Sequence, residues 1–316
     1  MPDMTDCRRD DVLRKLTYYS FLIDQLTMFS ITVHFLQLIL GIPVTGHYQS
    51  QGDGSMDVLL ELSGRPASHL YENDWAYFEP FHIPKRQAIR VTWGSVLNHS
   101  DFTVKTIFVI GREHFNEENE ELQKEIKLHK DVLIGDYIDS YWNNTLKFLS
   151  SVQFSFSYCH QNYTVPYAFF VDDDYLVLVQ NLIAEIKKYD MNDRLYMGWR
   201  FDTRPFRTRF HKHRVSIASY PFNRYPPYIS AGAVLLSSQT IREMYHAIQF
   251  TRLYVYDDVY AGILAKSLNL TVRHNKNMRF WKAAVSVETK NLICAHGFEG
   301  EHLNSLYNKF RAKGIL

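Results

Sequence analysis

The sequence predicts an α/β domain with a mostly parallel central sheet and helices on both faces of that sheet. Beyond about residue 84, short apolar runs of strand length alternate with longer segments of helical periodicity. Strand–helix–strand alternation of this kind is typical of parallel sheets. In addition, 46% of the 316 residues are hydrophobic and 15% are aromatic. This composition is enough to bury the core of one large domain or two small ones.

The first half of this domain has a regular order of elements. The apolar run 104–110 is a predicted strand that stops at Gly111, and the charged segment 116–129 is a predicted helix. A second short strand is expected over 131–135 and a second helix over 141–154. These segments therefore predict two strand–helix units in succession.

The apolar run 168–171 leads into the most informative feature of the chain. It lacks polar–apolar alternation, as expected of a strand buried on both faces, and it ends in Asp172, Asp173 and Asp174. A helix is expected after the triplet, over 176–186. Carboxylates at the carboxyl end of a strand can share a divalent cation while a phosphate-bearing ligand fills the remaining positions. The alternative interpretation is a solvated turn or a helix cap.

Two features of the second half each allow two interpretations. The basic segment 204–214 could face a diphosphate or solvent. The segment 225–228, Tyr-Pro-Pro-Tyr, precedes a small-residue apolar run over 229–236 around Gly232. Its tyrosines could form a stacking surface for a sugar, or the segment could be a rigid turn packed on the core.

Asp257, Asp258 and His296 are further candidates for chemistry. The two aspartates open an apparent helix, where carboxylates are favoured as caps; the functional alternative is a general base placed by the helix start. His296 could be a metal ligand or a structural histidine.

The amino-terminal segment is interpreted as a signal anchor. The apolar stretch 28–44 is shorter than the ~20 residues that a spanning helix needs, so the predicted anchor extends over 17–44 behind a cytoplasmic tail at 1–16. A buried or amphipathic helix is the alternative. The polar segment 45–83 is then a stem, and 84–316 is the lumenal domain.

The orientation follows from the basic residues, because Arg8, Arg9, Arg14 and Lys15 precede the apolar stretch and the next basic residue is Arg65. Sequons for N-glycosylation support a lumenal body; they lie at Asn98, Asn143, Asn162 and Asn269. Cys159 and Cys294 would be the two lumenal cysteines, and they could form a disulfide or remain buried thiols.

Overall charge gives no support to nucleic-acid binding, because 35 basic residues nearly balance 34 acidic ones. The chain has three cysteines, and their spacing does not match a zinc site.

Six segments, taken in order, carry a family resemblance. They are KRQAIRVTWG at 85–94, DYIDSYWNNTLK at 136–147, the Asp triplet, YPPYISAGAVLLS at 225–237, DDVYAG at 257–262 and ICAH at 293–296. Together they resemble the motifs of the β-1,3-glycosyltransferases that use UDP-sugars, glycosyltransferase family 31. The chain departs from the family pattern at Asn144, Ile229, Ala231, Ala233 and Asp257. The motif variants look most like the brainiac branch of this family.

The resemblance implies a GT-A-type nucleotide-sugar-binding fold and an inverting, metal-dependent β-1,3-glycosyltransferase. The implied donor is UDP-GlcNAc or UDP-Gal, the acceptor is the 3-hydroxyl of a glycolipid or glycoprotein glycan, and the cofactor is Mn²⁺ or Mg²⁺. The implied location is the Golgi membrane, with a single-pass type II topology and the catalytic domain in the lumen.

The resemblance also assigns expected roles to single residues. Asp258 would take the proton of the acceptor hydroxyl. Asp174, with Asp172 and His296, would hold the metal, which neutralises the departing diphosphate. Donor binding is expected at Arg86, Arg90, Asp139, Lys147, Asp172 and Asp173, and the acceptor or sugar pocket at Tyr225, Tyr228, Gly232 and Asp257.

Other functions remain as alternatives. One is a β-1,3-galactosyltransferase of the same family, and another is a catalytically inactive, membrane-anchored carbohydrate-binding protein. A phosphatase that forms an aspartyl-phosphate fits less well, because the triplet lies in the middle of the chain and lacks the D-x-D-x-Thr/Val pattern.

Overall fold

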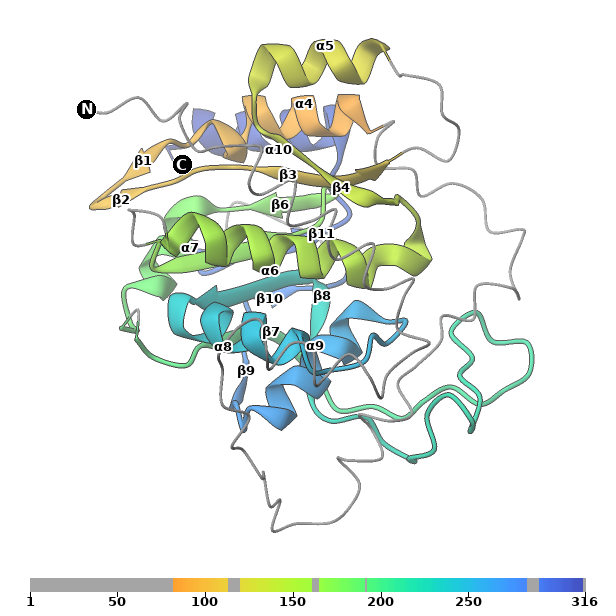
Figure 1. Cartoon of the computed structure of the whole chain (residues 1–316). Helices are drawn as coiled ribbons and strands as arrows, with labels where there is room; N and C mark the ends of the chain where they lie inside the picture. Colours follow the sequence, from red (N-terminus) through yellow and green to blue (C-terminus); the bar gives the residue numbers. More distant parts are fainter. Residues whose placement is uncertain (1–81, 113–119, 161–164, 191, 283–289, 315–316) are drawn as a thin grey trace.

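The computed structural model describes residues 82–112, 120–160, 165–190, 192–282 and 290–314 (Figure 1). The predicted tail 1–16, the predicted anchor 17–44 and the stem up to residue 81 lie outside the described residues. Within the described ranges, the helices are too short or too polar to cross a membrane.

The described chain has a mixed α/β fold around a four-stranded sheet. The strands occur in the order β5 (Tyr167–Val171), β8 (Tyr228–Ser237), β7 (Tyr196–Phe201) and β9 (Val272–His274). The α/β prediction is confirmed. The prediction of a mostly parallel sheet is wrong here, because β8 is antiparallel to both of its neighbours and only β7 and β9 are parallel. The connection from β7 to β8 at 202–227 contains no helix, and the chain re-enters the sheet beside β7 in the opposite direction instead of through a helical crossover.

Smaller sheets accompany this one. β3 (Phe108–Arg112) and β4 (Val132–Ile138) are parallel and flank α5 (Glu120–His129), as the strand–helix pattern predicted. β1 (Asn98–His99) and β2 (Phe102–Thr103) form a short antiparallel pair. β11 (Cys294–His296) lies between β10 (Met278–Arg279), to which it is parallel, and β6 (Tyr175–Val177), to which it is antiparallel.

One boundary differs from the prediction in a way that matters for the site. The helix expected over 176–186 begins later, as α7 (Val179–Ile186), because β6 pairs with β11 and is fully buried. The Asp triplet therefore lies in a turn between two strands, β5 and β6, rather than at the start of a helix.

The other helices pack around these sheets. Figure 1 shows α4 (Ile83–Val91) beside α10 (Gly300–Ala312), and the two helices are in contact. The helix expected over 141–154 is observed as the 3₁₀ turn η4 (Tyr141–Asn143) followed by α6 (Asn144–His160). α6 contacts both α8 (Ser238–Ile248) and α9 (Asp257–Ser267), and η3 (Trp93–Ser95) follows α4.

The four-stranded sheet separates two hydrophobic clusters. Along β5, Tyr167, Phe169 and Val171 pack against the cluster that contains β6 and β11, whereas Ala168 and Phe170 pack against the cluster that contains α9. Successive side chains of a strand point to opposite faces, so an unbroken apolar run can supply both clusters. The prediction that this strand is covered on both faces is confirmed, although its residues are only partly buried.

Candidate functional site

The triplet centre, formed by Asp172, Asp173 and Asp174, is held between β8 and β11. The Asp172 N–H donates to the carbonyl oxygen of Gly232 at 3.1 Å. A Cβ atom at Gly232 would collide with the hydroxyl of Tyr175, so β8 can pass this close to the triplet only with glycine there. Gly232, expected in a sugar pocket, therefore has a positioning role in the fold.

Asp173 faces basic side chains at the start of α4. Its carboxylate lies 2.7 Å from His82 Nδ1 and 3.6 Å from Lys85 Nζ, and Lys85 also pairs with Glu299 at 2.7 Å. Burial opposes ionisation of Asp173, but the hydrogen bond with His82 and the nearby positive charges outweigh it, so the pKa of this carboxyl is below its ordinary value. Asp173 is therefore a charged member of the centre.

Asp174 is the best candidate metal ligand of the triplet. Its Oδ2 lies 2.9 Å from His296 Nε2, while its backbone oxygen accepts hydrogen bonds from the N–H groups of Gly297 and Phe298 at 2.9 and 2.8 Å. Its Oδ1 is buried and has no hydrogen-bond partner among the described residues. Burial raises the pKa of this carboxyl. Buried carboxylate oxygens in proteins normally have a hydrogen-bond or ionic partner. A bound cation would be such a partner for Asp174 Oδ1.

The predicted metal set was Asp174, Asp172 and His296. The structure brings Asp174 and His296 together, but over the described ranges it assembles no group of three or more His, Cys, Asp or Glu side chains around one point. Asp172 is exposed at the edge of the turn. The Asp174–His296 pair fits a cation of the Mg²⁺ or Mn²⁺ type, which takes few protein ligands and completes its shell with water and phosphate oxygens.

The α9 pair, Asp257 and Asp258, occupies the first turn of its helix. Asp258 Oδ1 accepts a hydrogen bond from the Val259 N–H at 2.7 Å. Burial raises the pKa of both carboxyls, and the charge of Asp257 raises that of Asp258 further. A carboxylate whose pKa is raised in this way is a stronger base than an exposed one, which is what proton abstraction from a hydroxyl requires.

Lys147 connects the two acidic sites. Its Nζ lies 3.0 Å from Asp139 Oδ1; its positive charge partly offsets the rise that burial causes in the pKa of Asp257, and it adds to His82 and Lys85 in lowering the pKa of Asp173. The triplet centre and the α9 pair therefore share one electrostatic neighbourhood. Sequence reasoning assigned Lys147 to the donor but did not find this link.

Asp139, also expected at the donor, is 1% exposed. Its Oδ2 accepts a hydrogen bond from the Gly111 N–H at 2.7 Å and its Oδ1 holds Lys147. Asp139 therefore positions Lys147 and the end of β3 instead of presenting its carboxylate to a ligand.

The contacts of Arg86 and Arg90 give no support to the expected donor binding. Arg86 is 2% exposed and binds Glu125 through Nε and Nη2 at 2.9 and 2.6 Å. Arg90 binds Glu125 at 2.6 Å and Asp131 at 2.7 and 2.8 Å. These ion pairs join α4 to α5 and to the start of β4.

Other residues of the segment 85–94, to which the sequence analysis gave no role, lie next to the Asp triplet. Lys85 contacts Asp173, and the indole N–H of Trp93 donates to the Tyr175 carbonyl at 3.0 Å. His82, just before α4, makes the closest contact to Asp173. Only the position of Lys85 and Trp93 inside the segment 85–94, which resembles a family motif, could have indicated this.

Tyr225 and Tyr228 are buried in the cluster that contains α9, which favours the packed turn over the stacking surface. Tyr225 Oη lies 2.9 Å from Tyr254 Oη, and Tyr228 Oη lies 3.0 Å from Thr203 Oγ1. A Cβ atom at Gly262 would lie 2.6 Å from Tyr228 Cβ, so glycine allows α9 to pack directly on this turn.

A different, half-buried aromatic cluster lies beside the α9 pair. Tyr256, immediately before Asp257, is 6.5 Å from Trp142 and 5.6 Å from His213 between ring centroids. Tyr141 packs edge-on against Trp142 at 5.3 Å, and its hydroxyl is 3.2 Å from His213 Nδ1. These rings are better placed than Tyr225 or Tyr228 to contact a sugar.

The remaining predictions concern modification. Asn98 and Asn269 are exposed, and Asn143 is partly buried, with its amide donating to the Ile138 carbonyl at 2.8 Å. Asn162 lies outside the described residues. Cys294 is a free, buried thiol in β11, and the side chain of Cys159 lies outside the described residues.

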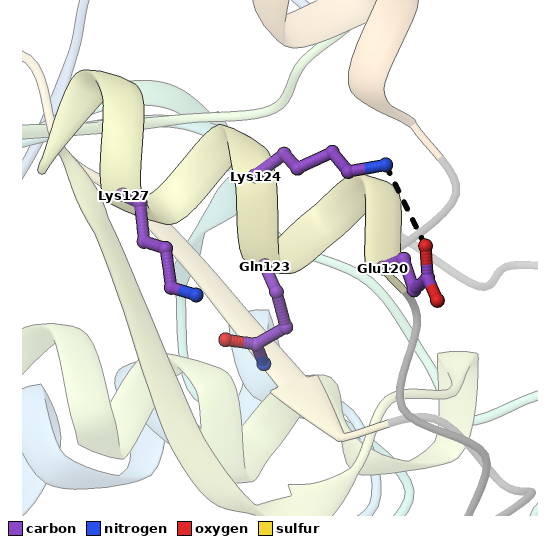
Figure 2. Close-up of a pocket in the computed structure, with 4 residues that line it drawn as sticks. All are labelled: Glu120, Gln123, Lys124 and Lys127. Atoms are coloured by element: carbon purple, nitrogen blue, oxygen red, sulfur yellow. Dashed lines mark ion pairs between the residues drawn. The ribbon is translucent and has the colours of Figure 1, made fainter.

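A hollow on the outer face of α5 is unrelated to these sites. Figure 2 shows its lining side chains, Glu120, Gln123, Lys124 and Lys127, along this one helix, with an ion pair between Lys124 and Glu120. All of them are exposed, as is usual for a solvated helix face.

Comparisons with known proteins agree with the motifs. A galactosyltransferase family model matches residues 84–276. The chain is 39% identical to "Beta-1,3-galactosyltransferase bre-5" of Caenorhabditis elegans and 32% identical to "Beta-1,3-galactosyltransferase brn" of Drosophila melanogaster; each match covers 72% of this chain and 70% of the relative. The human "Beta-1,3-galactosyltransferase 1" is 28% identical over 73% of this chain and 71% of the relative. With its six motifs, a family model over most of the folded region and these relatives, the chain belongs to the galactosyltransferase family, glycosyltransferase family 31, and is a glycosyltransferase.

Proposed function

We propose that this enzyme is an inverting β-1,3-glycosyltransferase that moves GlcNAc or galactose from a UDP-sugar to the 3-hydroxyl of a glycan on a lipid or a protein. The names of its relatives support the β-1,3 linkage and favour galactose, whereas the brainiac-like motifs favour GlcNAc. The proposal rests on two acidic sites that both experience the charge of Lys147. In the triplet centre, Asp174 has an unpartnered carboxylate oxygen and lies beside His296. In the α9 pair, the pKa of Asp258 is raised.

The triplet centre is the proposed donor end. Asp174 and His296 would hold Mn²⁺ or Mg²⁺, and the bound ion would supply positive charge for the departing diphosphate. Asp172 is exposed at the turn, where it would be available to the ribose of the donor or to the metal site. Asp173, fixed by His82 and Lys85, keeps its negative charge and orients these two side chains at the edge of the centre.

The α9 pair is the proposed acceptor end. Asp258 would accept the proton of the 3-hydroxyl as that oxygen attacks the anomeric carbon from the side opposite the leaving group. A single displacement of this kind inverts the anomeric configuration and needs no covalent intermediate. The cluster of Tyr141, Trp142, His213 and Tyr256 would stack on the acceptor sugar.

The proposed setting is the Golgi membrane, in which the segment 17–44 spans the bilayer and the folded domain lies in the lumen. The orientation of basic residues around that segment and the sequons support this setting. The exposed positions of Asn98 and Asn269 are compatible with glycosylation.

A donor screen of the full-length enzyme in detergent tests the proposal. UDP release is measured from UDP-GlcNAc, UDP-Gal and UDP-GalNAc with Mn²⁺, using β-mannoside and β-galactoside acceptors. The Asp258→Asn variant should lose turnover but retain UDP binding, and the exposed Asp101→Asn variant should behave as the parent. UDP binding without release from any pairing would support the inactive carbohydrate-binding protein instead.

A further inference from the structure

The loop at 202–227 connects β7 to β8, and internal hydrogen bonds fix its backbone. Arg207 holds it from inside: Nη1 donates to the carbonyls of Val215 and Ser216 at 2.9 Å, and Nη2 donates to those of Tyr220 and Phe222 at 2.6 and 2.9 Å. Four charge-assisted hydrogen bonds from one side chain fix the path of the loop. Figure 1 shows this teal segment extending away from the sheets and helices.

The loop exposes large apolar side chains at its surface. Phe210 is 91% exposed and Ile217 is 70% exposed, and Phe206 is partly exposed where it stacks on His211 at 3.8 Å between ring centroids. An exposed phenylalanine and isoleucine on a loop whose backbone is fixed are not required for packing. They indicate a surface that is covered in another state.

The same loop surface is strongly basic. Arg204, Arg209, Lys212 and Arg214 are exposed, and the sequence contains no Asp or Glu from 203 to 242. Arg207 of the basic segment is the exception, because its guanidinium is used inside the loop. Basic side chains around exposed apolar ones are the pattern of segments that lie in the headgroup region of a membrane. A soluble acidic partner would account for the basic residues but not for Phe210 and Ile217.

The loop is joined to the proposed acceptor end. His213 contacts the Tyr141 hydroxyl at 3.2 Å and the Tyr256 ring at 5.6 Å, and Tyr256 directly precedes the α9 pair. A partner that binds this loop would therefore lie next to Asp258.

We infer that the 202–227 loop docks on a phospholipid membrane surface, with Phe210 and Ile217 entering the interface and the basic side chains binding the phosphate groups of the headgroups. Docking would place a lipid-linked glycan, which projects from the same surface, beside Asp258. Docking itself does not depend on the proposed transfer reaction, but this consequence for the acceptor does.

Depth-dependent quenching in the full-length chain tests the docking. A fluorescent label is placed by Ala218→Cys, next to Ile217, and in a matched chain by Gln249→Cys, next to Phe250, which is 80% exposed in a turn after α8. Both chains are mixed with phosphatidylcholine vesicles, with or without phosphatidylserine, that contain nitroxide-labelled lipid; the parent chain measures background labelling. The label at 218 should be quenched, most strongly with phosphatidylserine, and the label at 249 should not.

Substitutions separate docking from a change in fold. Phe210→Ser with Ile217→Ser should weaken quenching at 218 by about tenfold or more at limiting lipid, because two apolar side chains no longer enter the interface. Phe250→Ser, a matched phenylalanine in a turn, should leave quenching unchanged. Quenching that is equal at 218 and 249, absent at 218, or preserved in the double variant would overturn the inference. Binding of heparin by the loop without quenching on vesicles would assign the surface to a soluble polyanion and would also overturn it.

A kinetic comparison separates this inference from the proposed function. The double variant should be slower on a glycan carried by a vesicle lipid but equal to the parent on the same glycan in solution. If the double variant matches the parent on both acceptors, the docking role is contradicted. If the parent transfers sugar to neither acceptor, the proposed function is contradicted, and the quenching result alone decides docking.

Discussion

Lys147 Nζ lies 3.0 Å from Asp139 Oδ1, and Asp139 is almost completely buried. From this position the ammonium group acts on Asp173 and on Asp257, which belong to the two ends of the proposed reaction. Asp139 therefore fixes the position of a positive charge that both acidic sites experience.

Asp139→Asn tests this positioning role. The change keeps the shape of the side chain but leaves the Lys147 ammonium without its buried counter-ion, so the free energy of unfolding should fall by about 3 kcal/mol in urea titrations. Asp136→Asn, three residues earlier in β4 and more exposed, is the matched control and should change stability by less than about 1 kcal/mol. Equal losses in the two variants would show that the burial of Asp139 has no special role.

Gly232→Ala tests the close approach of β8 to the triplet. The added methyl group would meet the Tyr175 hydroxyl, and overpacking of this kind costs roughly 1–3 kcal/mol of the free energy of unfolding. Tyr175→Phe removes the nearest atom, so in a double-mutant cycle it should recover part of the loss. Additive losses in the cycle would contradict the proposed collision.

His296→Ala tests the proposed cation site. If Asp174 and His296 hold the ion, loss of one ligand should raise the Mn²⁺ concentration for half-maximal UDP binding in calorimetry by at least about tenfold. The fit rests on the buried, unpartnered Oδ1 of Asp174 and on the 2.9 Å contact with His296. His302→Ala, an exposed histidine in α10, is the control. Unchanged Mn²⁺ dependence in the His296 variant would remove it from the site.

The sequence predicted which elements exist better than it predicted what their polar residues do. The strand β5 and the start of α9 were found because burial and periodicity are local properties. Arg86 was assigned to the donor because its motif resembles the family, but its partner Glu125 lies in another helix, and the sequence does not show such long-range pairs. The same is true of Tyr225, whose hydroxyl partner is Tyr254.

The antiparallel placement of β8 was missed for a related reason. Alternation of strands and helices predicts their order along the chain but does not determine beside which strand each one lies. Only pairing shows that β8 runs between β5 and β7, and this placement brings Gly232 to the triplet.

The pH dependence of transfer should depend on the charge of Asp257. Burial and this neighbouring charge hold the pKa of Asp258 above its ordinary value. A general base must be ionised, so activity should be lost as the pH falls through this raised pKa, at a higher pH than for an ordinary aspartate. Asp257→Asn removes the like charge, which lowers the pKa of Asp258, so the acidic limb of the kcat/KM profile for UDP release should move to lower pH. Asp193→Asn, remote from the pair in sequence and in a turn, should leave the limb in place. An acidic limb that stays fixed, or moves to higher pH, in the Asp257 variant would show that Asp258 is not the group whose ionisation limits the rate.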